Sequence, residues 1–493
     1  WNWIPIRVRY DKTAEFRSGL KNYGNAYHVA QSVWASIHLP ITKQMLKRGE
    51  DIPSHLPSDD DVYYNRMGNS VTRPLRDFHN LYVKRKLIQG VSKQGDSLYD
   101  LTVGKGGDLP KWIRSELRFV LGADISKDNI ENRLDGACAR YLNYARTVKR
   151  IPRCVFVQAD SSRNIQSGEA TYSTRGKEVI HAVFGESTRR PQEGTIGKGI
   201  HGRGKDGFQM TTAMFSLHYF FETKQTLHEF IRNVYEGTRR GGYFVGCAYD
   251  GQTIFRQLRN LKQGESVHEF VKTNYGEQKK IWEITKRYDA DDFPNDSSSL
   301  GYKIDVYQET INKVFGEYLI HFDYFTRIME QYGFQIISQE EARKFGFRNG
   351  TGLFDELYSQ MKRELRHESR NKGKEELVNE IGRANELEQE SSQQRVSFLN
   401  RYFIFKKVRD VNVSSIFKMH VEGAETIEQQ EKLRRQLRDK KVRSEPSIQV
   451  VEEDEEESED SSEEEESEDS SEEEESEDSS EEEESEEEEK EEE

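Results

Sequence analysis

The stretch Leu98-Tyr-Asp-Leu-Thr-Val-Gly-Lys-Gly-Gly-Asp-Leu-Pro-Lys-Trp112 joins a short apolar strand to a glycine turn and then to a helix. Glycines such as Gly104 and Gly106 let the backbone pass close to a ligand, in conformations that other residues avoid. Asp108 and the proline that follows are typical of a helix start, and a helix N-terminus attracts anionic groups. The pattern predicts the nucleotide-cofactor turn of an α/β domain.

Two classes of cofactor fit this turn. The dinucleotide fingerprint G-x-G-x-x-G requires a third glycine at an offset where this chain has none. An acidic residue before the glycines, here Asp100, is instead typical of S-adenosylmethionine (SAM) methyltransferases. Asp124 ends the next apolar strand and is well placed to accept hydrogen bonds from a ribose in either class. A Rossmann-type NAD-binding oxidoreductase therefore stays open as an alternative.

Four segments resemble motifs of the mRNA cap guanine-N7 methyltransferases and occur in the same order. Their residues are similar to those in the capping enzymes of large cytoplasmic DNA viruses. Besides the glycine turn they are Arg76-Asp-Phe-His-Asn-Leu-Tyr-Val-Lys-Arg-Lys-Leu-Ile88, Gln158-Ala-Asp-Ser-Ser162, and Phe215-Ser-Leu-His-Tyr-Phe-Phe-Glu222, the last as a cap-side strand. The match covers about residues 72–407. It implies a Rossmann-like α/β methyltransferase sheet with an inserted cap-binding subdomain, SAM as methyl donor, and the capped mRNA 5′ end as substrate.

The resemblance also implies which residues form the site. Those expected to bind SAM are Lys84, Asp100, Gly104, Gly106, Asp124, Asp160 and Ser161, and those expected to bind the cap are Asn80, Phe215, His218, Tyr219 and Glu317. Guanine N7 already carries a lone pair and the SAM sulfonium is an activated leaving group. We therefore expect alignment and electrostatics to suffice, with no general base and no metal. Aromatic stacking beside a carboxylate acceptor suits a guanine base.

Some positions depart from the family pattern. Thr102 stands where Gly or Ala is usual, Val103 where Cys is common, Met214 in place of Gln, and Asn400 in place of Tyr. A third hypothesis is therefore a catalytically degenerate regulatory or scaffold portion of a capping enzyme.

The first residues resemble the last motif of the capping guanylyltransferases, a strand of an oligonucleotide-binding (OB) fold. Arg7, Arg9, Asp11 and Lys12 would be its phosphate contacts. The nucleophile motif Lys-x-Asp-Gly is absent, because Arg133-Leu-Asp-Gly136 has an arginine that stays protonated. We expect the end of an OB-fold over residues 1–40, a linker over 41–72, and upstream triphosphatase and guanylyltransferase domains in a larger enzyme. An ordinary edge strand is the alternative for residues 7–12.

Charge divides the chain. Residues 452–493 hold 31 acidic residues and one lysine in Ser-Glu-Asp-Ser-Ser-Glu repeats, which predicts a disordered tail. Since all 493 residues carry a net charge of −16, the rest of the chain carries +14, as expected of a protein that handles nucleic acid. We expect a methyltransferase domain over residues 73–410 and a charged linker over 411–451. The basic, Gly-rich segment 167–207 is either an RNA-contacting loop or a solvated insertion.

The coarse pattern alternates helices and strands, which predicts a parallel sheet covered by helices on both faces. Helices are expected over residues 73–93, 108–117, 126–149 and 224–238, and strands over 98–102, 119–124, 154–158, 209–217 and 243–249. Strand-like pieces at 267–272 and 279–287 indicate the substrate-covering subdomain.

Three widely spaced cysteines and no long apolar run argue for an intracellular, reducing compartment without membrane contact. By resemblance this is the cytoplasmic viral factory or the virion. A stimulatory subunit or the transcription machinery is a further expected partner.

Overall fold

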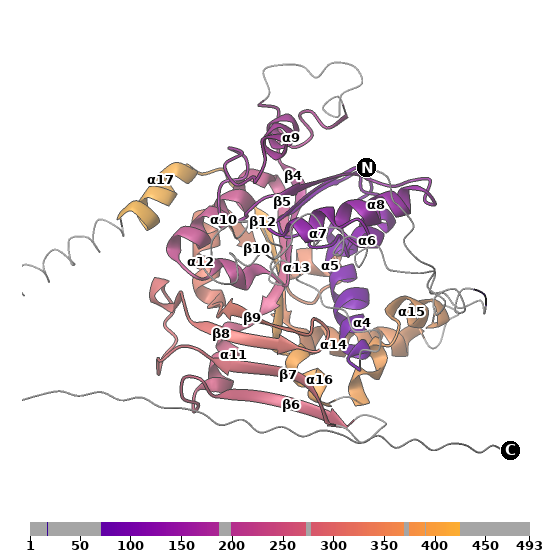
Figure 1. Ribbon diagram of the computed structural model, residues 1–493, viewed down its shortest axis with the longest axis vertical. Coiled ribbons are helices and arrows are strands. Elements are labelled where there is room, and N and C mark those ends of the chain that lie inside the picture. The colour runs from indigo at the N-terminus through magenta and orange to yellow at the C-terminus, as the bar shows by residue number, and fades with distance from the viewer. Residues whose placement is uncertain are drawn as a thin grey trace, which may run out of the picture. The chain divides into compact units, whose positions relative to one another are not determined.

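The computed structural model describes residue 17 and residues 71–186, 199–272, 278–368, 374–389 and 391–423 (Figure 1). These lie in the unit Trp1–Gln429, which is separate from Gln430–Glu493. Apart from residue 17, the predicted OB-fold remnant over residues 1–40, with Arg7, Arg9, Asp11 and Lys12, lies outside the described residues. So do nearly all of the linker 41–72 and the whole acidic tail 452–493.

The central sheet has eight strands, seven of them in the order β10-β12-β5-β4-β1-β2-β3, and β11 pairs with β12. Five strands run parallel: β1 (Ser97–Asp100), β2 (Phe119–Asp124), β3 (Arg153–Gln158), β4 (Phe208–Met214) and β5 (Thr238–Tyr249). The other three are β10 (Phe334–Ile336), β11 (Thr351–Leu353) and β12 (Asn400–Lys407). β12 is antiparallel to β5, β10 and β11. The α/β fold class is thus confirmed, but the sheet is mixed, because β12 lies between β10 and β5 and runs opposite to both.

Helices cover both faces of this sheet. Successive strand residues point to opposite sides: Leu98 and Val120 lie in one apolar cluster, and Tyr99 and Leu121 in another. On the first side pack α4 (Arg73–Asp77), the π-helix η2 (Phe78–Val83), α5 (Lys84–Val91), α6 (Leu109–Arg114) and α7 (Lys127–Glu131). The second side has α9 (Thr174–Phe184), α10 (Lys224–Gly237) and α12 (Phe322–Gln331).

The predicted helix over residues 126–149 is wrong in its continuity. It is broken into α7 and α8 (Ala137–Ala145). A Cβ on Gly136 would lie 2.6 Å from the Asn132 carbonyl oxygen, so the chain between the two helices has room only for a glycine.

The expectation that residues 167–207 form an irregular loop or insertion is wrong for residues 174–184. Helix α9 occupies the middle of this segment, and Ile180, Val183 and Phe184 are buried in the core together with Ile200. Over its described residues, 167–186 and 199–207, the segment is therefore the helical crossover that joins β3 to the parallel strand β4. Residues 187–198 lie outside the described residues.

A second, antiparallel sheet contains the strands expected over residues 267–272 and 279–287. It has the order β6 (Ser266–Lys272), β7 (Gln278–Lys286), β8 (Lys303–Gln308), β9 (Lys313–Tyr318) (Figure 1). Trp282, Ile284 and Ile304 are buried and join the core on the α4 side of the central sheet.

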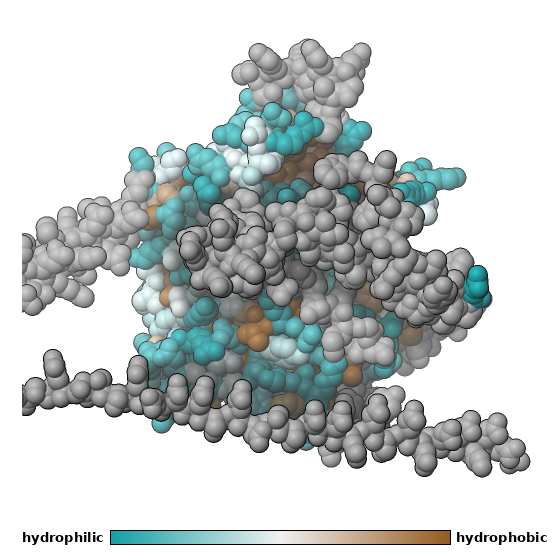
Figure 2. All heavy atoms as spheres, viewed as in Figure 1, coloured by the Kyte–Doolittle hydropathy of each residue, from teal (hydrophilic) through white to brown (hydrophobic). Residues whose placement is uncertain are grey.

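The remaining helices connect these parts. They are η4 (Leu217–Phe220), α11 (Gly251–Leu258), η5 (Ser297–Ser299), α13 (Gln339–Lys344), α14 (Phe354–Glu368), α15 (Lys374–Ile381), η6 (Ala384–Gln389), α16 (Ser391–Ser397), α17 (Val413–Phe417) and η7 (Lys418–Glu422). Hydrophilic residues cover most of the described surface on the face drawn in Figure 2, and hydrophobic residues appear there only in small groups. Within the described ranges, no helix has the length and apolar character needed to cross a membrane.

Candidate functional site

A cavity of about 820 Å³ opens at the carboxyl ends of the parallel strands, where ligands of such sheets bind. Of the twelve predicted site residues in the described part, ten line it: Asn80, Lys84, Gly104, Asp124, Asp160, Ser161, Phe215, His218, Tyr219 and Glu317. Asp100 and Gly106 do not. The structure thus brings segments more than 200 residues apart around one space.

The glycine turn and Asp124 form one hydrogen-bonded unit. Gly104 and Gly106 have φ of +53° and +67°, a region that favours glycine. The Asp124 carboxylate accepts from the Gly104 amide at 2.8 Å, the Ser126 amide at 3.0 Å and Asn129 Nδ2 at 2.9 Å. Burial raises the pKa of Asp124. A carboxylate has about four acceptor positions, so one is left for a hydroxyl of a ligand.

Asp100 supports the turn from behind the cavity wall. Its Oδ1 accepts from the Thr102 amide at 3.1 Å. Burial, followed by the nearby Asp108, raises the pKa of Asp100 to about 7. Asp100 and Gly106 therefore shape the turn, while Gly104 lines the space.

Lys84 lies in a buried cluster of three charges. Its Nζ is 2.8 Å from Asp108 Oδ2, and Lys111 Nζ is 2.7 Å from Asp108 Oδ1. Burial alone would raise the pKa of Asp108, but Lys111 and Lys84 outweigh it and hold that pKa well below its usual range. Two lysines against one carboxylate leave a net positive charge beside the cavity. The sequence analysis missed Lys111, although its i,i+3 spacing from Asp108 was a usable signal.

Hydrogen bonds within the protein hold the side chains at the predicted adenine end. Ser161 Oγ donates to the Leu101 carbonyl oxygen at 2.6 Å. Asp160 Oδ1 accepts from the amide and the hydroxyl of Ser162, at 2.9 Å and 2.6 Å. Ile125, not predicted, adds an apolar surface that is 57% exposed. An apolar side chain beside polar loop atoms suits a nucleobase.

His218 and Glu317 face each other at the other end. His218 Nε2 lies 3.6 Å from Glu317 Oε1, and both side chains are buried. Among the described residues, both ring nitrogens of His218 and Glu317 Oε2 lack a hydrogen-bond partner. Burial lowers the pKa of His218 to about 3 and raises that of Glu317 to about 8. Buried polar atoms without partners are costly, which indicates that a ligand completes this end.

Aromatic rings flank this pair. Phe215 has a φ of +61°, which is unusual for a bulky residue, and its amide donates to the Cys247 carbonyl oxygen at 2.7 Å. The Tyr219 ring lies edge-on to His218, with centroids 4.3 Å apart. The predicted strand through residue 217 is wrong, because β4 ends at Met214 and residues 217–220 form the short helix η4. That early end turns these side chains into the cavity.

The π-helix η2 brings in a residue that the sequence analysis missed. It carries Asn80, whose Nδ2 donates to the Arg76 carbonyl oxygen at 3.1 Å, and His79, which also lines the cavity. The His79 ring stacks on Phe215 at 5.0 Å between centroids and bonds Ser397 Oγ at 2.8 Å. π-helical turns are frequent at functional sites. The local sequence does not predict such turns.

Comparison with known proteins connects this geometry to a family. Residues 47–185 and 195–460 match the mRNA (guanine-N(7))-methyltransferase domain. The chain belongs to this family.

Relatives extend the comparison. The chain is 25% identical over 435 residues to the probable mRNA-capping enzyme of Acanthamoeba polyphaga mimivirus, covering 84% of this chain and 35% of that protein. It is 25% identical over 281 residues to the mRNA cap guanine-N(7) methyltransferase of Saccharomyces cerevisiae, covering 55% and 53%. The chain thus spans about a third to a half of the length of these relatives.

Solved structures include a SAM-dependent methyltransferase from Clostridium acetobutylicum, with a TM-score of 0.30 and 10% identity over 64% of this chain and 89% of that one. Another is the CcbJ methyltransferase of Streptomyces caelestis, with a TM-score of 0.34 and 11% identity over 69% and 99%. The fold assignment rests on the strand order and not on these values.

Membership of the cap methyltransferase family decides against the NAD-binding oxidoreductase.

The structure shows what two of the residues that depart from the family pattern contact. Thr102 Oγ1 and Ser216 Oγ are hydrogen-bonded at 2.6 Å, which ties the glycine turn to the loop after β4. Asn400 Nδ2 donates to the carbonyl oxygens of Val396 and Ser397. Both side chains thus have a bond within the protein.

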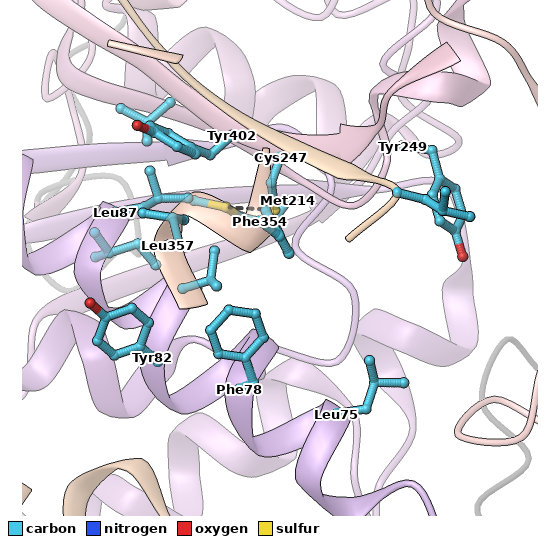
Figure 3. Close-up of a cluster of buried hydrophobic side chains, with 14 of the residues drawn as sticks. Leu75, Phe78, Tyr82, Leu87, Met214, Cys247, Tyr249, Phe354, Leu357 and Tyr402 are labelled. Carbon is cyan, nitrogen blue, oxygen red and sulfur yellow. Dashed lines mark hydrogen bonds between the residues drawn. The ribbon is translucent and has the colours of Figure 1, made fainter. Parts of the chain in front are cut away.

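Met214 packs into the core beside the cavity. Its sulfur lies 4.0 Å from Cys247 Sγ, and Figure 3 shows it close to Cys247, Leu87 and Phe354. In the cap methyltransferase family a glutamine is usual here. Met214 also lines the cavity, so it presents an apolar side chain where that glutamine would present an amide.

Proposed function

We propose that the chain transfers a methyl group from SAM to N7 of the guanine cap of mRNA, converting GpppN-RNA to m7GpppN-RNA, as part of a larger capping enzyme. The observation that carries the proposal is the buried, unpartnered pair His218 and Glu317 in the same cavity as the glycine turn. A cofactor end and a base-reading end are what methyl transfer to a nucleobase requires.

The cofactor end fits SAM by its donor set. The net positive cluster of Lys84, Lys111 and Asp108 suits the carboxylate of the methionine moiety. Asp124 has an acceptor position left for a ribose hydroxyl, and Ile125 with Asp160 borders the adenine. When bound, SAM supplies a methyl group on a positively charged sulfur.

The cap end fits guanine rather than adenine. Ionised Glu317 accepts from the N1 and N2 hydrogens of guanine, and neutral His218 donates to O6. Adenine has no N1 hydrogen and carries a donor at position 6, so both contacts would be lost. Phe215 and Tyr219 provide aromatic surfaces for the base.

The catalytic role of the protein is then mainly alignment. Guanine N7 carries a free lone pair, so no side chain needs to take a proton from it. The described residues contribute by holding the base and the cofactor in line and by excluding water from the cavity. No group of His, Cys, Asp and Glu within the described ranges is arranged to hold a metal ion.

We further propose that upstream triphosphatase and guanylyltransferase domains complete the enzyme and that it acts in the cytoplasmic viral factory or the virion. The similarity to the mimivirus capping enzyme, a longer protein, supports this proposal. A stimulatory subunit or the transcription machinery is an additional proposed partner.

An activity assay tests the proposed reaction. The chain is incubated with labelled SAM and GpppG-capped RNA, and the RNA is digested to nucleosides. We expect 7-methylguanosine as the labelled product. RNA capped with 7-deazaguanosine is the matched control, because it keeps the N1, N2 and O6 contacts but lacks N7; it should compete without being methylated. Binding of both ligands without transfer would instead support the degenerate scaffold.

A further inference from the structure

The buried carboxylate of Glu309 joins two walls of the cavity that belong to different parts of the chain. Its Oε2 accepts from Thr72 Oγ1 at 2.5 Å, and its Oε1 accepts from the Val71 amide at 3.3 Å and from Lys279 Nζ at 2.7 Å. The Glu309 side chain is 1% exposed. We name these contacts among Val71, Thr72, Lys279 and Glu309 the Glu309 latch.

The Thr72 side chain bonds Glu309 and does not cap the helix that follows. It is the N-cap residue of α4, yet its side chain makes no cap hydrogen bond. A threonine at this position normally accepts from an amide of the first helical turn. Here Gln393 Oε1 accepts from the Leu75 amide at 3.3 Å instead, and Gln393 Nε2 donates to the Val71 carbonyl oxygen at 3.2 Å. The Thr72 hydroxyl is thereby released for Glu309.

Each side of the latch carries residues of the proposed cap site. The segment that begins at Thr72 continues into α4 and η2, which bring Arg76 and Asn80 to the cavity. Glu309 lies in the turn between β8 and β9, and this hairpin contributes Ile311 and Phe315 before it reaches Glu317. The latch therefore links the two walls nearest the proposed cap.

The cofactor end is supported separately. Phe78, Tyr82 and Leu87 are almost completely buried and hold η2 and α5 in the core (Figure 3). Lys84 is in addition paired with Asp108. Loss of the latch should thus release the first turn of α4 and the β8–β9 turn but leave Lys84 and the glycine turn in place.

We propose that Glu309 and Thr72 are positioning residues for the capped substrate: their hydrogen bond sets the spacing between the N-terminal helix and the β8–β9 hairpin, and hence the affinity for the cap. The inference rests on the proposed function. Glu309 lines the cavity whereas Thr72 is buried and does not, so a Thr72 variant separates positioning from direct contact.

The test uses the full chain with Thr72→Val, Glu309→Gln and the double variant. The matched control is Glu283→Gln, because Glu283 in the same sheet also accepts from a lysine and a hydroxyl, Lys280 and Ser266, but makes no described contact with α4. We expect both single changes to raise KM for capped RNA about tenfold or more. The double variant should be no worse than Glu309→Gln alone, since Thr72→Val acts only through the bond to Glu309 that the glutamine already alters.

Other readouts separate this role from a general loss of structure. The dissociation constant for S-adenosylhomocysteine (SAH) and kcat should stay within about threefold, and Glu283→Gln should behave like the wild type. Amide exchange over residues 71–80 should become faster in both latch variants. An unchanged KM in Thr72→Val, or parallel losses of SAH and RNA affinity, would overturn the proposal. If the wild type methylates no cap, the proposed function fails, and the exchange measurement still decides whether the latch holds these segments.

Discussion

At the cofactor end of the cavity Asp124 accepts three hydrogen bonds from its own chain, whereas at the cap end His218 and Glu317 are as deeply buried and have no hydrogen-bond partner among the described residues. The first arrangement is preorganised, since its polar groups are satisfied before a ligand arrives. The second carries the cost of unpaired buried groups until a base supplies their partners. The difference indicates that selectivity for the base comes from the cap end, where buried polar atoms have no hydrogen-bond partner within the described protein.

The largest effect should come from the unsatisfied end. We expect Glu317→Ala to reduce cap methylation at least about a hundredfold, because the guanine N1 and N2 hydrogens lose an ionised acceptor, at about 1.5 to 3 kcal/mol each. SAH affinity, measured by calorimetry, should not change. Equal losses for SAH and cap would mean that the two ends are not independent.

The satisfied end should respond differently. Asp124→Ala removes both the ribose acceptor and the anchor of Gly104, so SAH affinity should fall about ten- to a hundredfold and the melting temperature should fall as well. Asp124→Asn, which keeps an acceptor, should recover part of the melting temperature but little of the affinity. Unchanged SAH affinity in Asp124→Ala would remove this residue from the cofactor site.

The cap end should make its own contribution to the pH dependence of stability, beside that of the buried Asp100 at the cofactor end. Burial raises the pKa of Glu317 to about 8, so the folded protein holds this proton while the unfolded chain releases it from about pH 4.5 upward. The stability of the ligand-free protein therefore falls between about pH 4.5 and 8. In a plot of melting temperature against pH, Glu317→Gln should reduce the slope over this range.

Cap affinity should instead increase with pH up to about 8, because guanine requires the ionised carboxylate. The neighbouring His218, whose pKa is lowered to about 3, stays neutral over this range, and burial keeps the Tyr249 hydroxyl protonated. A pH-independent cap affinity would contradict this assignment.

A smaller effect should follow from the bond that connects the two ends. Thr102→Val removes the hydroxyl that is bonded to Ser216 Oγ but keeps the shape of the side chain. We expect a loss of about 1 kcal/mol in unfolding free energy and at most about a threefold change in kcat. Ser216→Ala is the matched partner variant. A loss of activity beyond tenfold would show that Thr102 contributes directly to methyl transfer.

The smallest effect concerns the acidic tail, which carries −30 against a body of +14. If the tail competes with RNA for basic surfaces, deletion of residues 452–493 should tighten RNA binding at low salt, and the gain should fade as salt rises. Phosphorylation at Ser458, Ser467 or Ser476 should strengthen the competition. Equal affinities at every salt concentration would indicate a solubilising tail.

Much of the site was predictable, because motifs at strand ends carry local signals. The bounds of β2 and the positive φ of Gly104 follow from an apolar run and a glycine turn. What sequence could not predict depends on contacts distant along the chain. The bond between Thr72 and Glu309 spans 237 positions, and the break at Gly136 depends on a close backbone contact.

Amino-acid composition gave a wrong prediction for helix α9, because the segment that contains it is rich in glycine and basic residues. Residues 167–207 look like a loop by composition, yet Ile180, Val183 and Phe184 recur at helical spacing and are buried. The π-helix was unpredictable for a different reason, since one extra residue in a turn has no distinctive composition. His79 reaches the cavity because of that turn.

The central claim is that Glu317 and His218 read the Watson–Crick edge of guanine, and three cap dinucleotides test it most directly. GpppG, IpppG and ApppG are titrated by calorimetry into the SAH-saturated protein. Inosine keeps N1–H and O6 but lacks the N2 amine, whereas adenine lacks all three guanine features. Since each dinucleotide carries a second guanosine, that guanosine is N1-methylated in all three ligands, which blocks its Watson–Crick edge so that only the other end can bind. We predict affinity in the order GpppG, IpppG, ApppG, with a loss of at least about a hundredfold from first to last. Equal affinities for GpppG and ApppG would contradict the account.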